Sequence, residues 1–504
     1  MKPSNELFKF IHSLTKSEKR FFKLSSSFQS GEKNYVKLFD FIEQQERYDE
    51  DVLKNHFKDE TFIKHLPSEK NFLYSQILRS LRVYYSEHDT NSKLVSELQN
   101  IEILFEKHQY KVCRKRIVKG KRLARKFEKF YYLIAFINWE KKLLDEAIGE
   151  GRGKLSPQEI RKEELEVLEV LENFASLKLL YSKAEAEFNA KGYFYDCKED
   201  ISFVKIIEDE VFSEANTKSV KADIYAKYIV GIYNAMSNNH DEALMIFKKI
   251  DKIFDEHADI KSDFVNFYLQ TLNASINSYA LCRDLENAES ILNKIKFLEQ
   301  TRLFSSKRSK NKAKSIVLIQ SLYLNNMNGN FKESIAIYND WGGEFIDEMS
   351  KSNQLIAHYC IAYSFYLGEN PKQALKHINE VLNDSNLQIR LDIIVYAKIL
   401  ELAIHTELGN YDLLNYLVNS TNRYLNKMCS EKSALLVVLK HFKKIINKKD
   451  PHDIELLSAY EKELQDTLKS KEYKVDLYYL HFFAWIRAKR NHTSVATEIN
   501  SVNN

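Results

Sequence analysis

The feature that most constrains the fold of this chain is a short polar turn followed by a small or apolar residue, repeated at regular intervals. Five copies occur in the second half of the chain, at steps of 45, 46, 40 and 40 residues. A step of this size corresponds to one helical hairpin. The turn reverses the chain, and the small residue lets the second helix approach the first. The copies are NNHDEALMIF (238–247), RDLENAESIL (283–292), GNFKESIAIY (329–338), GENPKQALKHI (368–378) and GNYDLLNYLV (409–418), with the small or apolar residue at Ala243, Ala288, Ser334, Ala374 and Leu414.

Composition and periodicity favour helices along the whole chain. Glycine (12 residues) and proline (5 residues) are scarce among 504 residues, so long elements are expected and turn-rich β architecture is not. Apolar residues recur at spacings of three and four, and no sustained alternation with hairpin chemistry is present. The sequence therefore predicts an all-α protein of stacked antiparallel helical hairpins.

The hairpins resemble tetratricopeptide (TPR) repeats. The best copy is HYCIAYSFYLGENPKQALKHINEVL, in which Ala362 and Phe365 match the family's first helix and Ala374, Ile378 and Val381 match its second helix. The resemblance covers about 215–420 and implies a TPR-like right-handed superhelix. These hairpins are roughly 6 to 12 residues longer than the family's repeat of about 34, and the expected first-helix tryptophan is absent. Further matches are Gly231 with Ala243 and Phe247, and Tyr279 with Ala288 and Leu292.

Capping signals and composition divide the chain into five expected regions. Thr15 and Glu18 form a capping box in the first region, and Ser156 with Pro157 predicts the start of a long helix that ends near residue 190. The expected regions are an N-terminal helical bundle (1–90), a region of a helical hairpin and a long helix (91–214), a TPR-like repeat array (215–420), C-terminal capping helices (421–490) and a disordered tail (491–504).

The TPR resemblance also implies a binding site. In such arrays the first helices line a concave groove that takes extended peptides or helices. The groove-facing pattern of the family selects mainly tyrosine and asparagine here. Tyrosine supplies rigid contact area with a polar tip, and asparagine can hydrogen-bond to an extended backbone. The candidate partner groove consists of Tyr228, Asn273, Asn277, Tyr323, Asn326, Tyr359, Tyr363, Tyr366 and Tyr396. Packing between helices is the alternative role for several of these tyrosines.

A second candidate site is the basic segment KHQYKVCRKRIVKGKRLARKFEK (107–129). One interpretation is a solvated helix that pairs with acidic neighbours such as those at 158–172. The other is a patch that binds phosphates or an anionic partner, because clustered cations dominate nucleic-acid affinity. The net charge of +4 does not itself imply a polyanionic partner. A further basic stretch, SKRSKNKAK (306–314), is interpreted as a solvent loop. The candidate basic patch consists of Arg114, Lys115, Lys119, Arg122 and Lys126.

Signals for other functions are weak. The chain contains no H-E-x-x-H or G-x-S-x-G motif, no paired-cysteine metal motif and no apolar run long enough to cross a membrane. We therefore expect no catalytic site, metal or cofactor, and a cytoplasmic location. The leading hypothesis is a non-enzymatic adaptor that binds a peptide or protein segment. The alternative is a transcriptional or nucleic-acid-associated regulator with an N-terminal effector bundle. The sequence leaves the partner's identity and the oligomeric state open.

Overall fold

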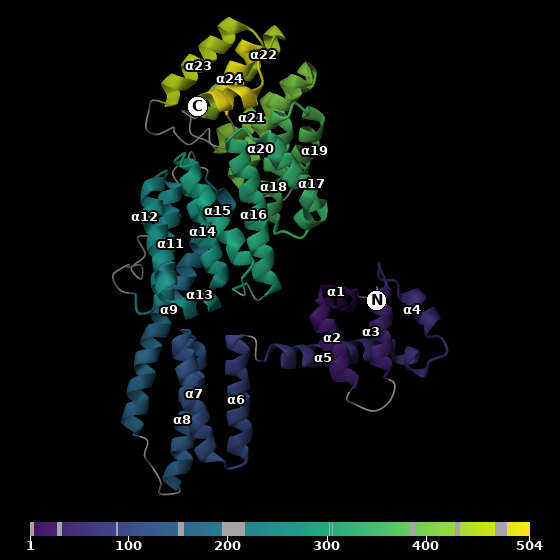
Figure 1. Cartoon of the computed structure of the whole chain (residues 1–504), viewed down its shortest axis with the longest axis vertical. Coiled ribbons are helices and arrows are strands. Elements are labelled where there is room, and N and C mark those ends of the chain that lie inside the picture. Colours follow the sequence, from purple (N-terminus) through teal and green to yellow (C-terminus); the bar gives the residue numbers. More distant parts are fainter. Residues whose placement is uncertain are drawn as a thin grey trace. The chain divides into compact units, whose positions relative to one another are not determined.

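The computed structural model describes residues 5–27, 33–86, 89–149, 156–193, 217–301, 303–304, 306–383, 389–428, 434–468 and 481–503. Over this part of the chain the secondary structure is helical and contains no strand, so the all-α prediction is confirmed. The chain divides into two compact units, Met1–Leu168 and Glu169–Asn504. Figure 1 shows the helices with their labels.

The first core of unit 1 is a small helical bundle. Leu38, Phe39, Leu73 and Ile77 are fully buried at its centre. The predicted capping box is present, because the backbone N–H of Thr15 donates to Glu18 Oε2 at 2.6 Å. The elements of this bundle are α1 (Glu6–Ser13), α2 (Lys16–Ser27), α3 (Asn34–Gln44), α4 (Glu50–His56), the 3-10 helix η1 (Thr61–His65) and α5 (Leu66–Tyr85).

The second core of unit 1 lies among longer helices. Gly120 lies against Phe136, and a Cβ atom at this glycine would meet the ring at 2.4 Å. The predicted long helix is present as α9, and the N–H of Glu159 donates to Ser156 Oγ at 3.4 Å. The boundary between the units falls inside α9, whereas the sequence placed boundaries at residues 90 and 214. These helices are α6 (Thr90–Glu106), α7 (Tyr110–Lys126), α8 (Phe130–Gly149) and α9 (Pro157–Lys191).

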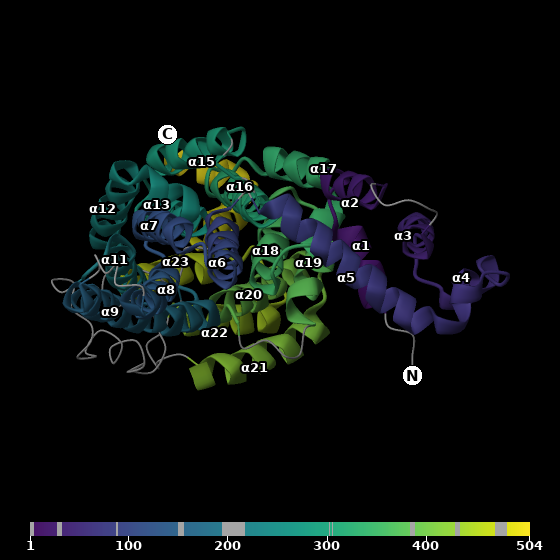
Figure 2. The same cartoon turned by 90° about the horizontal axis from the view of Figure 1, so that it is seen from below.

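Unit 2 is built mainly from consecutive helical hairpins, each of which packs on the next. The first helices α14, α16, α18 and α20 also contact one another in order. Figure 2 shows α16, α18 and α20 inside a rim that includes α12, α15, α17 and α21. The hairpins are α11 (Val220–Met236) with α12 (His240–Glu256), α14 (Val265–Leu281) with α15 (Leu285–Glu299), α16 (Lys307–Met327) with α17 (Phe331–Asp347), α18 (Lys351–Leu367) with α19 (Pro371–Leu382), and α20 (Leu391–Glu407) with α21 (Tyr411–Met428). The short helix α13 (Ala258–Asp263) precedes α14.

The five repeated turns have the same backbone geometry. Each contains one residue in the left-handed region, with φ from 56° to 71°. The following N–H then donates to the carbonyl five residues earlier, as in the 2.8 Å bond from Asn239 to Asn234. This arrangement ends one helix and directs the chain into the next. The left-handed residues are Asn238, Arg283, Gly329, Glu369 and Gly409.

The small or apolar residue after each turn is completely buried, as the repeat pattern predicts. Ala243, Ala288, Ser334, Ala374 and Leu414 all have an exposed fraction of 0%. The register of the hairpins is therefore confirmed by these five positions.

The C-terminal helices contact the hairpins. The expected disordered tail (491–504) is wrong for the described residues, since α25 occupies most of it. Ala496 and Ile499 are buried one turn apart, and Asn500 lies beside Gly329 in the turn between α16 and α17. A nine-residue helix carries too short a periodic pattern to recognise, and this contact stabilises it. The helices are α22 (Ala434–Lys448), α23 (Ile454–Leu468), α24 (Phe482–Asn491) and α25 (Val495–Asn503).

Candidate functional site

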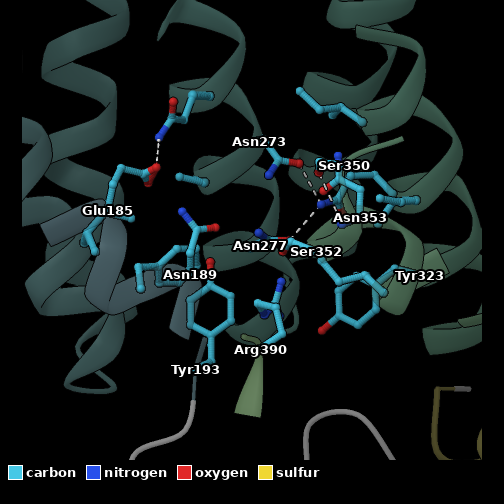
Figure 3. Close-up of a pocket in the computed structure, with 18 of the residues that line it drawn as sticks. Glu185, Asn189, Tyr193, Asn273, Asn277, Tyr323, Ser350, Ser352, Asn353 and Arg390 are labelled. Carbon is cyan, nitrogen blue, oxygen red and sulfur yellow. Dashed lines mark hydrogen bonds between the residues drawn. The ribbon is translucent and has the colours of Figure 1, made fainter. Parts of the chain in front are cut away.

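A cavity of ≈ 260 Å³ with both polar and apolar lining lies among the first helices of unit 2. It is lined by side chains from the end of α9 and from α11, α14, α16 and α18, together with Arg390 just before α20. Figure 3 shows Glu185 and Asn189 on one side, Ser352 and Asn353 on the other, and the asparagines of α14 between them. Successive hairpins therefore each contribute one wall of this cavity.

The centre of the cavity is a cluster of side-chain amides. Gln320 Nε2 donates to Asn273 Oδ1 at 2.9 Å and to Asn277 Oδ1 at 2.8 Å. Asn277 also hydrogen-bonds to the side chain of Tyr193, whose pKa burial raises to about 12. Gln320 is buried, and no donor among the described residues reaches its Oε1. Amides arranged in this way can hydrogen-bond to the N–H and C=O groups of a peptide.

One wall of the cavity carries an acid and a base on either side of a glutamine. Gln270 Nε2 donates to Glu185 Oε2 at 2.7 Å, and Gln270 Oε1 accepts from Tyr181 at 3.2 Å and from Lys312 Nζ at 3.4 Å. Burial raises the pKa of Glu185. Burial also lowers the pKa of Lys312 to about 8, although the nearby charge of Glu185 raises it; the charge of Arg308 lowers it further. Burial therefore opposes the charge of both groups, while each charge partly stabilises the other.

The opposite end of the cavity is closed by a buried ion pair. Arg390 donates to both carboxylate oxygens of Asp392, from Nε at 2.8 Å and from Nη2 at 2.6 Å. Asp392 Oδ2 also accepts from the backbone N–H of Tyr193, and the N–H of Arg390 donates to the carbonyl of Asn189. A Cβ at Gly192, which has a φ of +66°, would lie 2.1 Å from Asp392, so only glycine fits there. The end of α9 is thereby fixed to the start of α20.

Four of the nine candidate groove residues line the cavity, namely Tyr228, Asn273, Asn277 and Tyr323. They come from α11, α14 and α16, the first three hairpins of the array. On these three helices, the positions selected from the resemblance to TPR repeats lie around one cavity.

The other five candidates lie between helices and not at the cavity. Asn326 Nδ2 donates to the carbonyl of Cys360, and the Tyr363 hydroxyl lies 2.7 Å from His481 Nδ1, just before α24. Tyr366 donates to Glu407 at 3.3 Å. Tyr359 and Tyr396 are exposed by only 2% and 3%. In the structure these side chains make packing contacts, which was the alternative role considered for the tyrosines.

Several cavity residues were not selected from the sequence. Gln270 was not selected, but it shares one stripe of α14 with the selected Asn273 and Asn277, at spacings of three and four in a helix that is otherwise mostly apolar. That polar stripe is a signal that could have identified Gln270. Lys312 belongs to the basic stretch 306–314, which was wrongly interpreted as a solvent loop. Ser306 caps α16 there, since its Oγ accepts from the N–H of Ser309 at 3.1 Å.

The candidate basic patch lies on α7 and is partly neutralised by acidic neighbours. Glu97 pairs with Lys119 at 2.7 Å and with Arg116 at 2.8 Å. Glu163 on α9 pairs with Lys121 and Arg125. Within the basic patch, Lys115, Lys119, Arg122 and Lys126 are exposed and Arg114 is half-buried. The acidic segment at 158–172 thus supplies ion-pair partners to the same helix.

No helix in the described part of the chain has the length and apolar character needed to cross a membrane. Among the described residues, no group of three or more His, Cys, Asp or Glu side chains is placed to hold a metal ion. The chain matches no family model, and no curated protein or solved structure matches it at a significant level.

Proposed function

We propose that this protein is a non-enzymatic, cytoplasmic adaptor that binds a peptide or protein segment in a groove of TPR-like repeats. The observation that carries the proposal is the cavity itself, which the first helices of successive hairpins line with both polar and apolar side chains. Each additional hairpin extends such a surface by one helix, and an extended surface suits an extended ligand. The hairpins of unit 2 would form the TPR-like right-handed superhelix that the sequence resemblance implies.

The chemistry of the cavity supports a peptide as the ligand. Its centre presents the amides of Asn273, Asn277 and Gln320, which can satisfy backbone N–H and C=O groups. Tyr228 and Tyr323 add aromatic area beside these amides. Apolar side chains such as Ile316 and Ile319 line the same space, so a small apolar side chain of the ligand can also be accommodated.

Purification of the tagged full chain with its bound partners tests this proposal. Partners identified by mass spectrometry with the wild type should be lost from the Asn273→Ala/Asn277→Ala variant, because both substitutions remove amides from the cavity. Lys314→Met is the matched control, since this lysine is exposed on α16. Circular dichroism must show that all variants remain helical. Partners retained by the folded double variant would refute the groove assignment.

The regulator hypothesis has the N-terminal bundle contact nucleic acid, and the candidate basic patch on α7 is the surface that would supply the cations. We disfavour it because Glu97, Glu140 and Glu163 already neutralise part of this helix. The full chain should therefore not bind duplex DNA at about 50 mM salt, where non-specific electrostatic affinity is strong. Salt-sensitive binding that is abolished by Arg114→Glu/Lys115→Glu/Arg122→Glu would favour the regulator instead.

A further inference from the structure

The cavity holds two groups of opposite charge that attract each other without forming a direct ion pair. Glu185 on α9 and Lys312 on α16 both line it. Neither forms an ion pair with any residue that the structure describes. The amide of Gln270 lies between them, 2.7 Å from the carboxylate and 3.4 Å from the ammonium group. One amide group therefore spans the gap between the two charges.

Both side chains are half-buried, so each has lost part of its contact with water. A charge removed from water costs free energy unless a partner of opposite charge or several hydrogen bonds compensate it. Gln270 donates one hydrogen bond to Glu185, and Lys312 donates one long hydrogen bond to the side-chain oxygen of Gln270. The pKa of Glu185 is raised and that of Lys312 is lowered to about 8, both primarily by burial. A ligand that brings one charge of each sign would offset these penalties.

We propose that the cavity binds a small zwitterion, a free α-amino acid or a short peptide with both ends unblocked, through its ammonium group at Glu185 and its carboxylate at Lys312. This inference rests on the proposed function, because it names the ligand chemistry of the same groove. The two sources share one chemistry, an ammonium and a carboxylate group on one short chain.

Size and geometry agree with a short ligand. The cavity volume of ≈ 260 Å³ is below the roughly 300–1,000 Å³ of pockets that hold drug-sized molecules. The amide of Gln270 shows that a group a few atoms long reaches both charged side chains. Asn273 and Asn277 line the same cavity and can hydrogen-bond to the internal amide of a short peptide.

Ligands with a single sign of charge fit this wall less well. A phosphate or another anion would pair with Lys312 but would lie close to the carboxylate of Glu185. An organic cation would meet the reverse problem at Lys312. Arg390, the other cation that lines the cavity, already donates to both carboxylate oxygens of Asp392. The pair of opposite charges thus selects against singly charged ligands.

Ligand-observed NMR on the full-length wild type tests the inference with three probe sets. The first set is a pool of the common dipeptides with free ends, the second is the same pool acetylated and amidated, and the third is a pool of free amino acids. Members of the first or third set should bind, and blocking the ends should weaken binding at least about tenfold. Whether the first or the third set binds more tightly identifies the source of the zwitterion.

Two pairs of variants locate the binding within the cavity. Glu185→Gln and Lys312→Met should each weaken the binding of the best free-ended probe at least about tenfold. Glu187→Gln, two residues away on α9, and Lys314→Met, on α16, should leave it unchanged. Circular dichroism and thermal melting confirm that each variant is folded. Because the comparison of blocked and free probes uses only the wild type, it does not depend on the folding of any variant.

The possible failures are distinguishable. If blocked and free dipeptides bind equally, or if no free-ended probe binds at concentrations up to about 10 mM, the zwitterion inference is overturned. Partners that still depend on Asn273 and Asn277 would then leave the proposed adaptor function standing. Loss of the zwitterion signal together with partners indifferent to those asparagines would overturn both.

Discussion

Replacement of Gly231 by alanine tests the packing of the first hairpin of unit 2. Gly231 lies on α11 opposite Phe247 of α12, and a Cβ at this position would lie 2.6 Å from Phe247 Cε1. Carbon atoms pack best at about 3.5–4.0 Å, so either the ring or the helix must move. Phe247 is fully buried, which leaves its ring no solvent to move into. We expect this overpacking to cost about 1–3 kcal/mol.

Gly343→Ala supplies the matched control for this substitution. Gly343 also lies in a helix, α17, but a Cβ added at this glycine would have no neighbouring atom within 4 Å. Alanine is favoured over glycine by about 1 kcal/mol in a helix interior, and this gain applies to both positions. Gly343→Ala should therefore stabilise α17, while Gly231→Ala should be neutral or destabilise α11 by up to about 2 kcal/mol. The difference between the two variants isolates the overpacking cost.

Hydrogen exchange measured by mass spectrometry reports this difference locally, as opening free energies of amides in α11, α12 and α17. Exchange should become slower in α17 for Gly343→Ala, whereas in α11 and α12 it should be unchanged or faster for Gly231→Ala. The double variant Gly231→Ala/Phe247→Leu should recover part of the loss, since the smaller side chain makes room. Equal stabilisation by both single variants would refute the close contact between α11 and α12.

Three further substitutions or conditions test other parts of unit 2. Ala374→Trp should destabilise the α18–α19 hairpin by roughly 1–3 kcal/mol or more because Ala374 is fully buried. Lys372→Trp should change the stability little because Lys372 is exposed, and equal melting temperatures of the two variants would contradict the register that places Ala374 between the helices. Asp392→Ala should lower the free energy of unfolding by about 3–5 kcal/mol, since it removes the carboxylate that pairs with the buried Arg390. An unchanged urea midpoint would contradict a stabilising role for this ion pair. Burial lowers the pKa of His240 from 6.5 to about 4, so unfolding at a pH between these values takes up a proton. The free energy of unfolding should therefore fall as the pH falls from 6.5 to 4, by up to about 3 kcal/mol from this group. A fall that is equally large in His240→Gln would contradict this role.

The sequence predicted the hairpins well because their signals are local. A turn, a small residue and an apolar residue four positions later lie within one short segment, and the same geometry follows wherever they occur. Ala374 and Ala243 were identified in this way, and both are fully buried. The long helix α9 was predicted for the same reason, from the cap formed by Ser156.

The cavity was predicted only in part because its walls depend on packing between distant segments. The family's pattern places Tyr359 and Tyr363 on the inner face of α18, but both are buried among other helices. The hydroxyl of Tyr363 lies next to His481, which is 118 residues away in the chain. No local pattern predicts such a contact. Lys312 was missed because its serine- and lysine-rich surroundings have the composition of a loop, although they form the first turns of α16.

The hydrogen bond between the Tyr193 N–H and Asp392 determines when the cavity can be completed during synthesis. The two residues are 199 positions apart, so at about 5–20 residues per second Asp392 is synthesised roughly 10–40 s after Tyr193. Helices α11 to α18 can stack during that interval, because each hairpin packs mainly on its neighbours. Arg390 is the last of the residues that line the cavity to be synthesised. Until residue 392 has been synthesised, the contacts of Arg390 and Asp392 with the end of α9 cannot form, so the cavity cannot be closed at that end.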